Sequence, residues 1–120
     1  MELYVKSELT LEALAAKVIR EALPAYTGEI REDQDVGGGR YYALNFDKNE
    51  IILIHNHSGH ARYFVEAMKQ FSYYFYVRSG PEELLPDMQD SLSAAGFSCE
   101  LADHGNWTES AQQSGWRIKQ

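Results

Sequence analysis

Apolar and polar residues alternate most clearly in residues 40–56, and this alternation predicts a β-hairpin. Apolar and aromatic side chains dominate both arms, and residues 47–49 between them have the chemistry of a turn. Residues 51–54 are apolar at every position, which is typical of a central strand that is covered on both faces. Alternation divides the first arm into two faces, one with Tyr42, Leu44 and Phe46, the other with Tyr41, Ala43 and Asn45.

Two other segments repeat apolar residues every three or four positions, which predicts amphipathic helices. Thr10 is placed to cap the first helix, and Pro24 ends it. The second follows Pro81 or Pro86 and stops at Gly96. The expected buried stripes are Leu11, Leu14, Ala15, Val18 and Ala22 in the first helix, and Leu84, Leu85, Met88, Leu92 and Ala95 in the second.

Shorter patterns lie between these elements. Strands are expected at residues 3–5, 71–77 and 97–101. The acidic segment 29–35, which precedes three glycines, is either an edge strand with a glycine turn or a mobile loop. A further helix of about three turns is predicted by the spacing of Ala61, Phe64, Val65 and Met68.

The order of elements is therefore β-α-(β)-β-β-α-β-α-β, which predicts an α+β fold. We expect a mixed, mostly antiparallel sheet with two or three helices packed on it. A chain of 120 residues has room for one domain, so residues 1–120 are expected to form a single globular unit. Residues 103–120 are polar apart from a few aromatic and aliphatic positions, and we expect them to be a loosely docked tail.

The formal charge of −7 and the pI near 5.0 indicate which partners the chain can attract. An acidic protein repels nucleic acids and anionic membranes and attracts basic proteins. Acidic residues and tyrosines together resemble the composition of a protein interface with aromatic anchors. The predicted partner-binding residues are Glu29, Glu32, Asp33, Asp35, Tyr41, Tyr74 and Tyr76.

The single cysteine, Cys99, cannot form an intramolecular disulfide, which favours a reducing compartment. Neither a signal-peptide pattern at Met1 nor an apolar run long enough to span a bilayer is present, so a cytoplasmic protein is expected. Cys99 alternates with Phe97 and Leu101, which places it on an apolar face, where a free cysteine usually serves packing.

The histidines His55, His57 and His60 follow the predicted central strand with the spacing HxHxxH. Imidazoles two residues apart on an extended segment point the same way, so this cluster is the candidate zinc site of a small metal-dependent hydrolase. The motif resembles the metallo-β-lactamase opening HxHxDH, but Gly59 replaces the aspartate. The alternative is a polar turn that caps a helix. No catalytic residue and no cofactor are expected in that case.

Three stretches together resemble the small acidic immunity proteins of bacterial toxin systems: YYALNFDKNEIILIHN, YYFYVRSGPEELLPDMQDSLSAAGF and SCELADHGNW. The resemblance spans residues 40–107. It implies a non-enzymatic protein that neutralises a cognate toxin, often a nuclease, by tight binding. The residues and this resemblance favour a binding protein with a basic partner over an enzyme, and the zinc hydrolase is the alternative.

Overall fold

The computed structural model describes residues 1–34, 37–56, 64–65, 68–102 and 116–117. It contains two helices and eight strands within these residues. In chain order they are β1 (Glu2–Lys6), α1 (Leu11–Ala22), β2 (Thr27–Glu32), β3 (Gly37–Phe46), β4 (Asn49–His55), β5 (Phe64–Val65), β6 (Tyr73–Ser79), α2 (Leu84–Ala94), β7 (Ser98–Ala102) and β8 (Trp116–Arg117).

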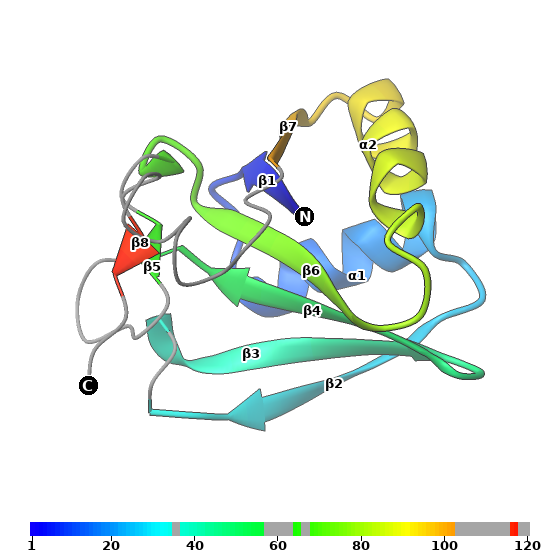
Figure 1. Ribbon diagram of the computed structural model, residues 1–120, viewed down its shortest axis with the longest axis horizontal. Helices are drawn as coiled ribbons and strands as arrows, with labels where there is room; N and C mark the ends of the chain where they lie inside the picture. Colours follow the sequence, from blue (N-terminus) through cyan, green and yellow to red (C-terminus); the bar gives the residue numbers. More distant parts are fainter. Residues whose placement is uncertain (35–36, 57–63, 66–67, 103–115, 118–120) are drawn as a thin grey trace.

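Six of the strands form one sheet in the order β2-β3-β4-β6-β1-β7. Each neighbouring pair in this sheet is antiparallel. Figure 1 shows β2, β3, β4 and β6 side by side, with α1 behind them and α2 beside β1 and β7. The prediction of an α+β fold with a largely antiparallel sheet and helices packed on it is therefore confirmed.

The predicted hairpin consists of β3 and β4, which are joined by Asp47 and Lys48. Asp47 has φ 54°, a left-handed conformation that aspartate tolerates better than most residues. Beyond β3, β2 pairs from Thr27 to Glu32 and is an edge strand of the sheet. The edge-strand alternative for the acidic segment is thus correct over the residues that β2 covers.

Local sequence signals set the ends of α1. The Oγ1 atom of Thr10 accepts a hydrogen bond from the backbone N–H of Ala13 at 3.2 Å, which is the predicted cap. The helix ends at Ala22, one residue before its C-cap, Leu23. The residue after that is Pro24, which has no N–H with which to continue the helix.

The second helix, α2, begins at Leu84 with Pro86 inside its first turn, where a missing N–H breaks no helical hydrogen bond. Gly96 follows the helix with φ 96°. The N–H of Gly96 bonds to the carbonyl of Ser93, and the N–H of Phe97 bonds to that of Leu92. These two bonds form the glycine-dependent stop that the sequence predicts.

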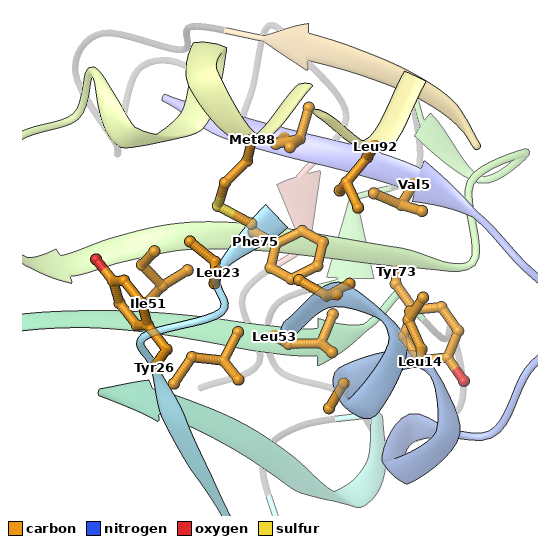
Figure 2. Packing of buried hydrophobic residues seen from close by; sticks show 14 of the residues in the cluster. Val5, Leu14, Leu23, Tyr26, Ile51, Leu53, Tyr73, Phe75, Met88 and Leu92 are labelled. Carbon is orange, nitrogen blue, oxygen red and sulfur yellow. The ribbon is translucent and has the colours of Figure 1, made fainter. Parts of the chain in front are cut away.

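Both helices cover the same side of the sheet, which we call the helix face. Figure 2 shows Phe75 of β6 between Met88 and Leu92 of α2 on one side and Leu53 of β4 on the other. The buried core of the helix face consists of Leu3, Val5, Leu11, Leu14, Ala15, Val18, Leu23, Tyr26, Leu44, Ile51, Leu53, Tyr73, Phe75, Leu85, Met88 and Leu92.

The structure corrects two predictions between β4 and β6. Phe64–Val65, expected in a helix, form a strand that pairs with Trp116–Arg117, and the rest of that predicted helix except Met68 lies outside the described residues. Strand β6 begins at Tyr73, not at residue 71. Phe71 donates its N–H to the carbonyl of Met68 in a turn, and its side chain therefore lies on the opposite face from Tyr73.

Candidate functional site

The other side of the sheet carries a second group of apolar and aromatic side chains, to which neither α1 nor α2 contributes. We call this side the tyrosine face. Residues with even numbers in β4 and β6 and odd numbers in β3 project here, as the alternation predicts. Its buried members are Tyr4, Ala43, Ile52, Ile54, Phe71 and Tyr74, and its partly buried members are Tyr41, Met68, Tyr76 and Ala102.

Strand register gathers tyrosines that are far apart in the sequence. Tyr41 of β3 lies opposite Ile54 of β4. Ile54 lies opposite Tyr74 of β6, and Tyr74 lies opposite Tyr4 of β1. Side chains at directly opposed positions of antiparallel strands share a face and contact each other. These three tyrosines and Ile54 therefore form one row across four neighbouring strands.

Tyr4 is the fully buried end of this row. Its ring centroid lies 5.5 Å from that of Tyr74 and 6.1 Å from that of Phe71. The Tyr4 hydroxyl donates to Oε1 of Glu2 at 3.5 Å. Burial raises the pKa of Tyr4, and the nearby Glu2 carboxylate raises it further, so this phenol stays protonated. The group serves as a donor and a packing element.

A cavity of about 560 Å³ opens on the tyrosine face. Its described lining combines apolar and aromatic side chains with both charges, as in pockets that orient a ligand by a few polar groups. The apolar and aromatic part consists of Tyr41, Ile52, Ile54, Tyr74, Tyr76 and Val77, and the remainder of Met1, Glu2, Asp33, Arg78 and Glu82.

Glu2 is the most deeply buried carboxylate of this lining, with a side chain that is only 6% exposed. Its Oε2 atom lies 3.3 Å from the amine of Met1, and its Oε1 atom accepts the bond from Tyr4. The same amine lies 3.4 Å from Oε1 of Glu82, which is exposed. Acidic oxygens thus lie both at the base of the cavity and at its rim.

A chain of ion pairs crosses the tyrosine face beside the cavity. Arg31 contacts Glu29 at 2.7 Å and Glu50 at 3.2 Å, and Arg78 contacts Glu50 at 3.3 Å. Hydrogen bonds to Glu29 and to Tyr41 raise the pKa of Arg31. Two guanidinium groups are therefore held among carboxylates and a tyrosine on this face.

The structure brings only some of the predicted partner-binding residues together at the cavity. Tyr41, Tyr74, Tyr76 and Asp33 meet at the cavity, although Tyr74 is buried and forms part of its base. Glu29 lies nearby, paired with Arg31.

Glu32 lies apart from this group. It is opposite Arg40, whose guanidinium reaches Glu12 of α1 at 3.0 Å, so Glu32 belongs to the helix face. Asp35 lies outside the described residues.

Sequence reasoning missed four charged residues of this site: Glu2, Arg31, Glu50 and Arg78. The alternation of residues along a strand could have identified two of them. Glu2 precedes Tyr4 by two residues, and Glu50 precedes Ile52 by two, so each carboxylate projects from the tyrosine face with its neighbour.

The candidate zinc ligands are described only in part. His55 ends β4 on the helix face, where its ring stacks on Tyr73 with centroids 4.9 Å apart. His57 and His60 lie outside the described residues. Within the part of the chain that the structure describes, no group of three His, Cys, Asp or Glu residues is arranged to hold a metal ion. The zinc hydrolase stays a prediction from the sequence.

Cys99 lies opposite Val5 and packs partly buried against the core of the helix face, as its alternation predicts. Burial raises the pKa of the Cys99 thiol, against the opposing effect of a hydrogen bond with Ser93. A protonated thiol is a poor nucleophile. Cys99 is thus a packing residue in this structure.

Comparisons with known proteins give no family assignment. No family model, curated protein or solved structure matches this chain. Among the described residues, no helix has the length and apolar character needed to cross a membrane.

Proposed function

We propose that this chain is a non-enzymatic binding protein of the immunity type, which inhibits a basic partner, such as a bacterial toxin domain, by covering it with the tyrosine face. The observation that carries the proposal is the cavity walled by tyrosines and lined by the carboxylates of Glu2, Asp33 and Glu82. Tyrosine is among the residues that supply most of the binding energy at protein interfaces.

The charge of the chain supports a basic partner. Its net value of −7 attracts a cationic protein over a distance of about one Debye length, roughly 8 Å at physiological ionic strength. Exposed carboxylates such as Glu82 then lie at the edge of the contact, where charges mainly increase the association rate. The partly exposed rings of Tyr41 and Tyr76 supply the apolar area that excludes water after the encounter.

The ion pairs beside the cavity support a rigid binding surface. Arg31 links β2 to β4 through Glu50, and Arg78 links β6 to the same carboxylate. Side chains that are already held in place lose less conformational entropy when a partner binds. A preorganised face suits a protein whose function is tight inhibition.

The test begins with affinity capture of a partner from the source cell, followed by identification and purification of any stoichiometric basic protein. Binding of the purified pair and the activity of the partner are then measured with Asp33→Asn/Glu82→Gln and with the control Asp87→Asn/Asp90→Asn. Each variant removes two negative charges, and the control residues are exposed positions on α2.

We expect the cavity variant to slow association by about three- to tenfold at low salt and the control to have a much smaller effect. The difference should shrink as salt rises, because screening weakens steering. Equal slowing by both variants would show that the tyrosine face is not the interface. If no basic partner is captured, or the partner keeps its activity in the complex, the inhibitory function is refuted.

A further inference from the structure

We propose that the cavity on the tyrosine face binds one arginine side chain of the basic partner, with the guanidinium group against Tyr41 and Tyr76 and near Asp33. This inference rests on the proposed function and names the chemical group that the interface recognises. Three properties of this face favour an arginine: the shape of the cavity, its charge and the contacts of Arg31, which already lies there.

The shape follows from the order of the strands. Strands β3 and β6 flank β4, so the strands that carry Tyr41 and Tyr76 are about 9.5 Å apart, twice the spacing of neighbouring strands. Between them, Ile52 and Ile54 of β4 form an apolar base. These isoleucines are only 1% and 4% exposed, so the methylene stem of an arginine would lie mainly against the partly accessible rings of Tyr41 and Tyr76, and its flat head can stack on one of them.

The charge of the cavity favours a cation. Its described lining contains the carboxylates of Glu2, Asp33 and Glu82 and the positive groups of Arg78 and the Met1 amine. Acidic groups are thus in excess, and Arg78 is also engaged by Glu50 outside the lining. A cation that enters a tyrosine-walled cavity gains from the ring quadrupoles as well as from the carboxylates.

Arg31 is an arginine of this chain whose guanidinium group is already bound on the tyrosine face. It lies between Glu29 and Glu50 and interacts with the hydroxyl of Tyr41, one of the residues that line the cavity. Carboxylate and phenol oxygens suit the fork of arginine donors better than the compact ammonium of lysine. The cavity offers groups of the same kinds, the rings of Tyr41 and Tyr76 and the carboxylate of Asp33, to an arginine that arrives from a partner.

The probe is a capped pentapeptide with a single central arginine between glycines, and its analogues carry citrulline or lysine at that position. Citrulline keeps the shape of arginine without its charge. Binding is measured by NMR titration of the whole chain, with the Ile52 and Ile54 methyl groups and the Tyr41 and Tyr76 rings as reporters. We expect the arginine peptide to perturb these reporters and to bind at least about threefold more tightly than either analogue.

Two pairs of variants, each with its own control, test whether the arginine peptide binds in the cavity. Tyr76→Leu removes a ring from the cavity wall, and Phe46→Leu removes a ring from the end of the hairpin, where Phe46 is 46% exposed. Asp33→Asn and the control Asp90→Asn each remove one charge. The cavity variants should weaken arginine binding by about threefold or more, and the controls should leave it unchanged. Leucine keeps the wall apolar, which guards against unfolding.

Each contrary result overturns the inference. Equal binding of the citrulline peptide would exclude recognition of the cation, and equal binding of the lysine peptide would show recognition of charge alone. Perturbations away from the cavity would place the site elsewhere.

The inference and the proposed function can fail independently. If arginine peptides fail while a basic partner still requires the tyrosine face, the inference falls and the proposed function stands. If the peptides bind while no inhibited partner exists, the function falls and arginine recognition by the cavity stands.

Discussion

Gly28 in the edge strand β2 shows how a single residue fits the fold. A Cβ atom at this position would lie 2.1 Å from Cε1 and 2.9 Å from Cδ1 of Tyr42 in β3. The tyrosine ring thus occupies the space where any larger residue would place its side chain. An aromatic ring that covers a glycine on a neighbouring strand protects an otherwise weak position of a sheet edge.

Gly28→Ala should therefore destabilise the protein by about 1–3 kcal/mol, because the ring of Tyr42 has to leave its position. Equilibrium unfolding in urea measures the loss. The same substitution in a Tyr42→Leu background should have a clearly smaller effect, since leucine leaves more room. An equal loss in both backgrounds would mean that the glycine is required for a reason other than the ring.

Alternation separates Tyr41 from Tyr42 and Leu44 within its strand, and Tyr74 and Tyr76 from Phe75 within theirs, but it is the pairing of both strands with β4 that brings the three tyrosines to one face. Alternation was not sufficient for Phe71, because the turn before β6 interrupts the period-two pattern. Nor did the sequence reveal that Tyr74 would be buried while Tyr76 stays partly accessible. That difference depends on how much of the neighbouring chain covers each position.

The hydroxyl of Thr10 caps the first helix, α1. Thr10 satisfies the N–H of Ala13, one of four donors that the first turn of α1 leaves without a helical partner. Thr10→Ala should destabilise the protein by about 1 kcal/mol, while Thr10→Ser keeps the hydroxyl and should change stability by a few tenths of that amount. Urea unfolding again provides the measurement. Equal losses for alanine and serine would contradict a role for the hydroxyl.

Long elements were predictable because several local signals agree within each of them. In α1, the cap, the apolar stripe and Pro24 all indicate one helix. Phe64–Val65 had only the spacing of a few apolar residues, and these two residues form a strand with Trp116–Arg117, about 50 positions away. Such a short strand depends on its partner and not on the preference of its own residues.

For the molecule as a whole, the central feature is a sheet with buried residues on both faces. Ile52 is 1% exposed on the tyrosine face, and its neighbour Leu53 is fully buried on the helix face. Strand β4 therefore contributes to two cores at once. The prediction of a central strand covered on both sides is confirmed by this arrangement.

Ile52→Ala and Leu53→Ala should each destabilise the protein by about 2–5 kcal/mol, the usual loss when a large buried side chain is truncated. Leu9→Ala, at a position 39% exposed, is the control and should have a much smaller effect. Urea unfolding of the three variants tests the comparison. If Ile52→Ala resembles the control, the tyrosine face does not contribute to the stability of the fold.

The order of the strands was beyond sequence reasoning. Periodicity identifies a strand and its faces, but it does not reveal which strands are neighbours. Strand β1 lies between β6 and β7, so Leu3 is opposite both Phe75 and Leu101. Those contacts join residues more than 70 positions apart, and nothing in the five residues of β1 indicates them.

This position of β1 affects how the chain can fold during synthesis. The ribosome makes β1 before the other strands of this sheet, but its two neighbours in the sheet, β6 and β7, come much later in the chain. The hairpin of β3 and β4 and its partner β2 can pair as soon as they emerge, because their contacts are local. Strand β1 stays exposed to solvent or to chaperones until β6 and β7 have been translated, although its residues Leu3, Tyr4 and Val5 are fully buried in the folded protein. The strand that precedes all others of this sheet in the sequence is therefore among the last to be incorporated into it.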